Sequence, residues 1–320
     1  MSPRRILVVR LGAMGDILHT LPAAASLRAS FSGAAIAWIC HPKWRDLIEL
    51  NPAVDEPIYL DRRSPGSIWR AWRALRRQSF DLVTDFQGLT QSALVALLAK
   101  GGRRFGFDYS LVRETPAALF YHCHSKSEAA HVVDRNLDLA ILAGATSRVK
   151  AAPLPPGRPE GSLPSGRFVL AAPLAGWVSK QWPLENYSVL ARRLRHEAGA
   201  LLVLNGAPSQ EETLRQVEGA EVHISSIAGL IDATRRASAV LGLDSGPLHL
   251  AAALGRPGVA LYGPTDPGRN GPYSARITVL RAQRAETSYG REPVIHPSMR
   301  ELHPDAVFEA LRVRLREDRE

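Results

Sequence analysis

An aspartate beside a glycine-rich turn is the first feature of this sequence that is suited to chemistry. The segment LGAMGD at residues 11–16 directly follows an apolar run, and its glycines let the backbone turn tightly and approach a ligand. Asp16 stands where a helix is expected to begin. A carboxylate there either caps the helix or takes a proton from a substrate hydroxyl as a general base, and both interpretations stay open.

A second segment, DSGPLH at residues 244–249, also joins an apolar run to an expected helix. Pro247 favours the first turn of that helix, whose free N–H groups can bind phosphate. Asp244 and His249 flank the helix start. Alone, the histidine is more typical of a buried core position. The further loop GPTDP at 263–267 favours an anion-binding site instead.

Lys180 is the only lysine after residue 150, in a region that otherwise uses arginine. It lies in the loop WVSKQWP at 177–183, before an expected helix. A compact ammonium group at this place suits a diphosphate, and a solvated lysine without a ligand is the alternative.

Several common catalytic motifs are absent from the sequence. It contains no Asp-x-Asp pair, no histidine and cysteine cluster with metal-ligand spacing, no G-x-x-x-x-G-K-[ST] loop and no G-x-S-x-G turn. The sequence therefore predicts phosphate binding by protein groups without a divalent metal.

Alternating apolar runs and helical patterns must position these loops. Strands are expected at 4–10, 34–40, 57–61 and 81–87, with helices over 16–29, 43–50, 67–79 and 90–99. After the proline-rich stretch at 151–166, strands are expected at 168–173, 200–206, 221–225, 239–244 and 258–264, with helices over 183–199, from 209, over 227–237 and from 247. This order predicts an α/β protein with two Rossmann-like domains, 1–150 and 167–320, joined by a linker at 151–166 and ending in a helix. Ligands bind such sheets beyond the carboxyl ends of the strands.

The composition is that of a globular protein and favours anionic partners. Of 320 residues, 45% are hydrophobic and 22% charged, which is typical of globular domains. The two cysteines, Cys40 and Cys123, are far apart and indicate a reduced, cytoplasmic protein. No apolar run approaches the ~20 residues of a membrane span, and no signal peptide is visible. The net charge of +9 favours anionic partners, namely phosphorylated small molecules, acidic lipids or nucleic acid.

Taken together, the three loops resemble those of the ADP-heptose:lipopolysaccharide heptosyltransferases, a GT-B family (glycosyltransferase family 9). LGAMGDILHTLPA at 11–23 is similar to the N-terminal family signature, and VLGLDSGPLHLAAALGRPGVALYGPTDPGRNGPY at 240–273 to the C-terminal one. The segments 85–108 and 110–123 resemble most closely the subgroup that adds the first heptose, heptosyltransferase I.

The resemblance implies two doubly wound parallel-sheet domains facing a central cleft. It implies an inverting, metal-independent transfer of heptose from ADP-heptose to the Kdo of lipid A-linked inner core, with no cofactor, by a cytoplasmic enzyme peripheral on the inner membrane. Asp16 is then the catalytic base. The implied donor-binding residues, in the second domain, are Lys180, Gln210, Glu211, Asp244, Ser245, Gly246 and His249. The acceptor-binding residues expected in the first domain are Gly15, Arg62, Arg63, Gln87 and Arg113.

Two positions depart from the family pattern. Residues 173–176 (PLAG) stand where hydroxyl side chains are expected near the donor phosphates. Gln210, next to Glu211, stands where an acid is expected at the ribose.

The segment SIWRAWRALRRQS at 67–79 combines apolar and basic residues. Ile68, Trp72 and Leu75 have helical spacing, which predicts a surface helix of the first domain with Trp72 in the core. The alternative is a membrane-surface helix, with its arginines on acidic headgroups and Trp69 at the interface. Both interpretations can hold together.

Three other functions compete with this interpretation. One is a related family member that uses another nucleotide sugar or adds a later heptose. A nicotinamide-dependent oxidoreductase is disfavoured because Gly12 and Gly15 lack the third glycine of that fingerprint. Nucleic-acid binding is suggested only by net charge, since no basic tail or aromatic RNA-binding motif is present, and we expect no nucleic-acid partner.

Overall fold

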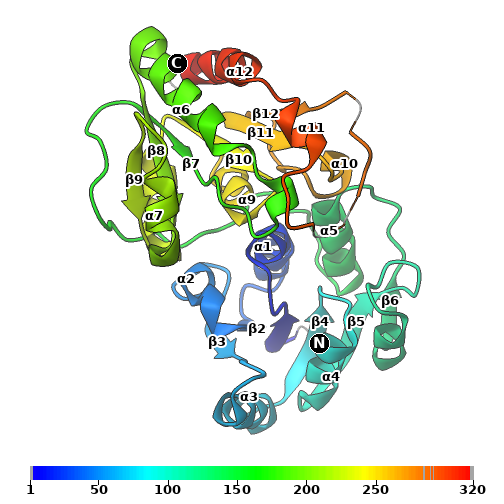
Figure 1. The fold of residues 1–320 in the computed structure, drawn as a ribbon. Coiled ribbons are helices and arrows are strands. Elements are labelled where there is room, and N and C mark those ends of the chain that lie inside the picture. Colours follow the sequence, from blue (N-terminus) through cyan, green and yellow to red (C-terminus); the bar gives the residue numbers. More distant parts are fainter. Residues whose placement is uncertain (1–2, 284, 289, 291, 318–320) are drawn as a thin grey trace. The chain divides into compact units, whose positions relative to one another are not determined.

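The computed structural model describes residues 3–283, 285–288, 290 and 292–317, and the chain divides after Pro155 into two compact units (Figure 1). Between the last helix of the first unit and the first strand of the second, residues 143–167 form neither helix nor strand. No helix in the described part of the chain has both the length and the apolar character needed to cross a membrane.

The first unit is built on a six-stranded parallel sheet with the order β3-β2-β1-β4-β5-β6. Its strands are β1 (Arg5–Val9), β2 (Ala35–Cys40), β3 (Glu56–Tyr59), β4 (Phe80–Asp85), β5 (Gly101–Phe107) and β6 (Cys123–Ser125). Its helices are α1 (Met14–Ser30), α2 (Arg45–Ile48), α3 (Pro65–Arg77), α4 (Thr90–Leu98) and α5 (Val132–Leu142), with the 3₁₀ helices η1 (Pro42–Trp44) and η2 (Thr115–Phe120).

The central strand β1 shows why this sheet forms. Its last four residues, ILVV, are all buried, as expected for a parallel strand that is covered on both faces. Helix α1 packs against α5, and α3 packs against α4, which in turn contacts η2. Helices thus supply the cover that the apolar strands require.

The second unit repeats the same plan with the strand order β12-β11-β10-β7-β8-β9. Its strands are β7 (Phe168–Ala171), β8 (Leu201–Gly206), β9 (Glu221–Ile224), β10 (Ala239–Leu243), β11 (Gly258–Tyr262) and β12 (Ile277–Arg281). Its helices are α6 (Leu184–Arg193), continued by the π-helical turn η4 (Leu194–Ala198), then α7 (Glu211–Leu214), α8 (Ile227–Arg236), α9 (Gly246–Ala253), α10 (Pro267–Asn270), α11 (Pro297–Arg300) and α12 (Pro304–Glu317), with the 3₁₀ helices η3 (Val178–Lys180) and η5 (Pro208–Gln210).

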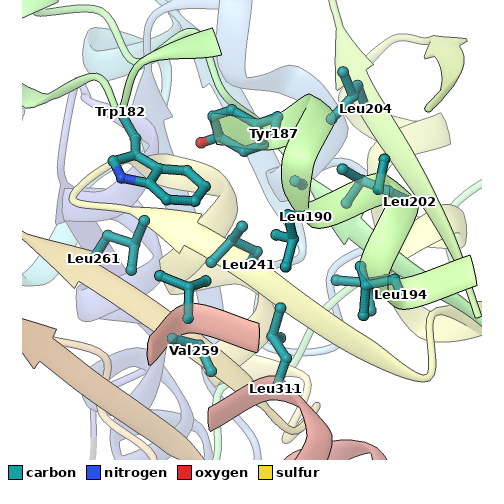
Figure 2. Close-up of a cluster of buried hydrophobic side chains, with 14 of the residues drawn as sticks. Trp182, Tyr187, Leu190, Leu194, Leu202, Leu204, Leu241, Val259, Leu261 and Leu311 are labelled. Atoms are coloured by element: carbon teal, nitrogen blue, oxygen red, sulfur yellow. The ribbon is translucent and has the colours of Figure 1, made fainter. Parts of the chain in front are cut away.

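A large apolar core lies under α6 in this unit. Trp182 and Tyr187 meet edge to face, with ring centroids 4.9 Å apart. Figure 2 shows them beside leucines of β8, β10 and β11 and beside Leu311 of α12. This packing anchors the loop that carries Lys180, because Trp182 follows that lysine by two residues and is fully buried.

Both sheets are α/β as the sequence predicts, but several elements escaped the sequence pattern. The prediction lacks β5, β6 and α5 in the first unit and β12 in the second. Strand β5 begins GGRR, a poor strand signal, and β6 and β12 lie at sheet edges, where burial is partial. The helix expected at 43–50 is shorter, and it and the helix expected from 209 are each a 3₁₀ turn followed by four α-helical residues.

The predicted core position of Trp72 is wrong. The buried stripe of α3 is Ser67, Ala71 and Leu75, and the indole of Trp72 is 47% exposed. Small side chains at 67 and 71 let the helix lie close to the sheet, and the Ser67 hydroxyl accepts a hydrogen bond from the backbone N–H of Asp61 at 2.9 Å. The larger neighbours therefore turn outward.

Each sheet has one point where the strand order reverses. In the first unit it lies between β1 and β4, and in the second between β7 and β10. The loops that leave two such strands diverge and form a crevice at their carboxyl ends, which is the usual ligand site of open α/β sheets. Asp16 follows β1, Lys180 follows β7 and Asp244 follows β10.

Candidate active site

Asp16 lies in the first turn of α1 and accepts a hydrogen bond from the backbone N–H of Ala13, with 3.3 Å between Oδ2 and the nitrogen. The helix-capping contact considered from the sequence is therefore present. This long hydrogen bond involves only one carboxylate oxygen of Asp16. Other neighbours must therefore stabilise the negative charge.

Two arginines surround the Asp16 carboxylate. Nη2 of Arg10 lies 2.8 Å from Oδ2, and Nη2 of Arg113 lies 3.2 Å from both oxygens. Arg10 is only 2% exposed and also donates to the Phe86 carbonyl, whereas the side chain of Arg113 is 48% exposed. Burial acts to raise the pKa of Asp16, but the two guanidinium groups outweigh it and hold that pKa below its usual value. Asp16 is thus an anion at neutral pH.

A buried hydrogen-bond network around Asp85 holds the loop that precedes Asp16. The Gln87 side-chain oxygen accepts the backbone N–H of Leu11 at 2.7 Å, and the Gln87 N–H donates to Asp85 at 2.8 Å. Ser92 and Tyr121 donate their hydroxyls to the other Asp85 oxygen at 2.8 and 2.7 Å. Burial raises the pKa of Asp85 despite these bonds. Gln87, predicted to bind the acceptor, here positions the loop before Asp16.

The glycine at the start of the loop is required by an aromatic neighbour. Gly12 has φ +155°, and a Cβ at this position would lie 2.6 Å from Nε1 of Trp44. The close approach expected of this glycine is therefore made to an indole of the same unit.

The remaining predicted acceptor residues are dispersed. Gly15 is the second residue of α1. Arg62 and Arg63 are exposed between β3 and α3, where the Arg62 guanidinium donates to Gln91. In the part of the chain that the structure describes, Arg113 contacts Asp16 and these two arginines do not.

In the second unit, Lys180, Asp244 and His249 form one cluster. Lys180 Nζ lies 2.5 Å from Asp244 Oδ2, and His249 Nε2 lies 3.7 Å from Oδ1. The ammonium group also stands over the Trp177 ring, 4.2 Å from its centroid. Three of the predicted donor residues, from the loop after β7 and the segment after β10, thus meet at the reversal point of the second sheet.

Electrostatics keep the Asp244 carboxylate charged. Burial acts to raise the pKa of Asp244, but the hydrogen bond from His249 and the charge of Lys180 outweigh it and hold the pKa well below its usual range. Burial and the nearby Asp244 carboxylate raise the pKa of Tyr262. Within the described residues, no group of three or more histidine, cysteine or acidic side chains is arranged to hold a metal.

Two further polar groups lie in the loops after β10 and β11. Ser245 is the N-cap residue of α9 and Gly246 its first residue, and the Ser245 side chain makes no capping hydrogen bond. In the loop after the neighbouring strand β11, the Thr265 hydroxyl is buried and has no hydrogen-bond partner among the described residues. Backbone N–H groups and hydroxyls here suit an anion.

The predicted ribose residues lie after β8, beside β7. The Gln210 side-chain oxygen accepts the backbone N–H of Ala207 at 2.9 Å, and Glu211 pairs with Arg215 at 2.5 Å. Neither contacts the Lys180 cluster in the described residues.

Sequence reasoning missed Arg10, Asp85, Tyr121, Trp177 and Tyr262. For Arg10 a signal existed, because it is a basic residue at the end of an apolar run, next to the glycine loop. Trp177 became visible as a contact with Lys180 within one loop, and Asp85, Tyr121 and Tyr262 as contacts between different elements.

The sequence profile of glycosyltransferase family 9 (heptosyltransferase) matches residues 68–294. The chain belongs to this family. It is 29% identical to lipopolysaccharide heptosyltransferase 1 of Escherichia coli over 308 residues, which cover 88% of this chain and 94% of that protein. It is 27% identical to lipopolysaccharide heptosyltransferase 2 of Salmonella typhimurium, covering 98% of this chain and 99% of the relative.

Solved structures agree with this assignment. The E. coli heptosyltransferase WaaC with ADP superposes with a TM-score of 0.79 at 27% identity, covering 97% of this chain and 99% of that one. The predicted family, GT-B fold class and glycosyltransferase activity are therefore confirmed. The roles of the individual site residues stay predictions.

Proposed function

We propose that this family 9 glycosyltransferase moves heptose from ADP-heptose to the Kdo of a lipid A-linked inner core, as the first heptose. The observation that carries the proposal is that the first unit contains a charged candidate base and the second unit a candidate phosphate site. Asp16 is an anion held by two arginines at one reversal point, and Lys180 and the start of α9 meet at the other.

The donor is inferred from the second unit. The Lys180 ammonium group can neutralise a diphosphate, and α9 offers backbone N–H groups beside it. ADP and ADP-2-deoxy-2-fluoro heptose are the ligands named for WaaC structures at 27% identity. Lys180 then leaves Asp244 for the phosphate, or bridges both.

The chemistry follows as one displacement. The acceptor hydroxyl attacks the anomeric carbon of heptose, its proton passes to Asp16, and the bond from that carbon to the ADP oxygen breaks. ADP leaves with the bonding electrons, and Lys180 with the α9 N–H groups stabilises the added negative charge. The configuration inverts, and no step requires a divalent metal.

The acceptor is inferred from charge. Kdo carries a carboxylate, and Arg113 is the exposed member of the pair around Asp16. An acceptor carboxylate that draws Arg113 away removes one of the two charges that lower the Asp16 pKa, which makes Asp16 a stronger base. Arg62 and Arg63 would add to the positive surface. An acceptor anchored in lipid places the enzyme at the inner face of the inner membrane, as a cytoplasmic peripheral protein.

The deciding experiment is ADP release from ADP-heptose, with and without Kdo–lipid A, for the wild type and Asp16→Asn. Asparagine keeps the size of the side chain and its oxygen for the Ala13 N–H, but it cannot take the proton. We expect acceptor-dependent release to fall about 10²–10⁴-fold with ADP affinity unchanged.

Asp134→Asn, which alters an acid in the first turn of α5, serves as the matched control and should retain activity. Full activity of Asp16→Asn would leave Asp16 as a helix cap only. Added EDTA should not change the rate, and inhibition that magnesium reverses would contradict metal independence.

A later heptose transfer is the second candidate, because heptosyltransferase 2 relatives also align over nearly the whole chain. The same assay with an acceptor that already carries one heptose distinguishes the two. Faster release with that acceptor would move the assignment to the later step.

A further inference from the structure

Three neighbouring elements of the first unit expose large apolar side chains. They are Ile68, Trp69 and Trp72 on α3, Leu94, Leu97 and Leu98 on α4, and Leu119 on η2, each 42–70% exposed. Helix α4 contacts both α3 and η2, so the three elements adjoin, and Figure 1 shows α3 and α4 near one another. We call this set the apolar face.

The core does not require these side chains. The buried positions of the same elements are mostly small, namely Ser67 and Ala71 on α3, Ala93 and Ala96 on α4, and Ala117 and Ala118 on η2. On these elements many large apolar side chains are exposed and mostly small ones are buried, which is the reverse of an ordinary surface helix. Clustered exposed apolar side chains of this kind mark an interaction surface.

The charge around the apolar face is mainly positive, and the exposed Glu114 at the start of η2 is an exception. Residues 62–107 contain nine basic residues and two acidic ones, Asp81 and Asp85, and neither α3 nor α4 contains an acid. Asp81 accepts the backbone N–H groups of Arg4 and Arg5, and Asp85 is buried. All charged side chains of α3 are therefore exposed arginines, and α4 carries no charge.

Trp69 and Arg73 also form a cation–π contact on this face. The Arg73 guanidinium lies 5.2 Å from the centroid of the Trp69 ring. This contact holds a cation beside a half-exposed indole. Indoles favour the boundary between headgroups and acyl chains, and arginine pairs with lipid phosphates.

We propose that the apolar face docks on an anionic lipid bilayer, with the leucines and tryptophans in the interfacial layer and the arginines on headgroup phosphates. The inference deepens the proposed function, because a lipid-linked acceptor lies in such a surface. A second copy of the chain is a poorer occupant, since two positive faces would repel. An acidic protein would satisfy the arginines but gives no particular role to the seven exposed apolar side chains.

The test is co-sedimentation of the full chain with vesicles of phosphatidylcholine, with and without phosphatidylglycerol. We expect binding only to the anionic vesicles, and weaker binding as salt rises. Trp69→Ser with Leu97→Ser, and separately Arg73→Gln with Arg77→Gln, should each reduce binding about tenfold or more.

Matched controls lie on the second unit. Val313→Ser removes an equally exposed apolar side chain of α12, and Arg192→Gln with Arg195→Gln removes two exposed charges of α6 and η4. These variants should bind as the wild type does. Equal loss in the controls, equal binding to neutral vesicles, or no binding at low salt would overturn the proposal. Self-association that Trp69→Ser abolishes would assign the face to a second copy instead.

Turnover separates this inference from the proposed function. With a water-soluble, deacylated Kdo acceptor, the face variants should match the wild type, and with the lipid-embedded acceptor they should be slower. Vesicle binding without turnover on either acceptor would refute the proposed function and leave the docking face in place. Turnover on the soluble acceptor without vesicle binding would refute the docking face and leave the proposed function in place.

Discussion

The chemistry of Asp16 is set by its neighbours rather than by its own side chain. A carboxylate in the first turn of a helix is common, and its capping bond to Ala13 is ordinary. The two guanidinium groups are unusual, because Arg10 is buried and Arg113 is half exposed. One arginine can therefore stay in place while the other is available to a substrate.

Replacing Arg10 should change the pH profile of the reaction. In Arg10→Met the burial of Asp16 is opposed by one cation instead of two, so its pKa rises. The base must be deprotonated, so the acid limb of kcat/KM moves to higher pH. Arg10→Lys should restore most of the wild-type profile. Arg28→Met, which breaks another ion pair of this unit, is the control. An acid limb that stays in place in Arg10→Met would refute the electrostatic role of Arg10.

Thr265 offers a second test at this scale. Its hydroxyl is buried and lacks a partner among the described residues, so a donor phosphate that accepts its hydrogen bond would satisfy it. Thr265→Val should weaken ADP binding by about 0.5–1.5 kcal/mol, measured by calorimetry. Thr234→Val is the control, because that hydroxyl donates to the Leu230 carbonyl within α8. Equal ADP affinity in Thr265→Val and the wild type would remove Thr265 from the donor site.

At the scale of elements, helix α3 shows how small residues decide which face is buried. Spacing alone allows a stripe of Ile68, Trp72 and Leu75, and also one of Ser67, Ala71 and Leu75. The second stripe faces the sheet because it permits closer approach of the helix backbone. The bulky stripe is left on the surface, where it is available for binding.

This orientation predicts a contrast in stability. Leu75→Ala should lower the free energy of unfolding by about 2–5 kcal/mol, because a fully buried leucine is lost. Trp72→Ala should change it by only about 0.5 kcal/mol, as is usual for exposed positions. Urea unfolding measures both. A larger loss for Trp72→Ala than for Leu75→Ala would contradict the orientation of α3.

At the scale of the whole molecule, two units of similar topology contain different parts of the proposed active site. Each has its own sheet and its own buried core. The proposed base lies in one unit and the proposed phosphate site in the other. The proposed reaction therefore needs groups from both units.

Amide hydrogen exchange on the full chain tests this division. ADP alone should slow exchange in the second unit, chiefly after β7 and β10, because a ligand stabilises the region that binds it. Peptides from 3–155 should exchange at the same rate with and without ADP. Lys180→Ala should lose the protection at equal ADP concentration. Protection centred on the loop before Asp16 would place the nucleotide in the wrong unit.

Much of this protein can be predicted from its sequence. Alternating apolar runs and helical patterns determine most strands and helices, because burial on both faces of a parallel sheet demands continuous apolar segments. The loops that contain Asp16, Lys180 and Asp244 are also evident locally, since glycines, a proline and isolated charges stand directly after such segments.

Only the tertiary structure decided which of these groups meet. Strand order brings Lys180 to Asp244 across 64 residues and Arg113 to Asp16 across 97, and no local pattern encodes those pairings. The same holds for β5, whose glycines and arginines become a strand through pairing with β4. Local propensity depends on neighbours in the chain, whereas the charge of a site and the hidden face of a helix depend on neighbours in space.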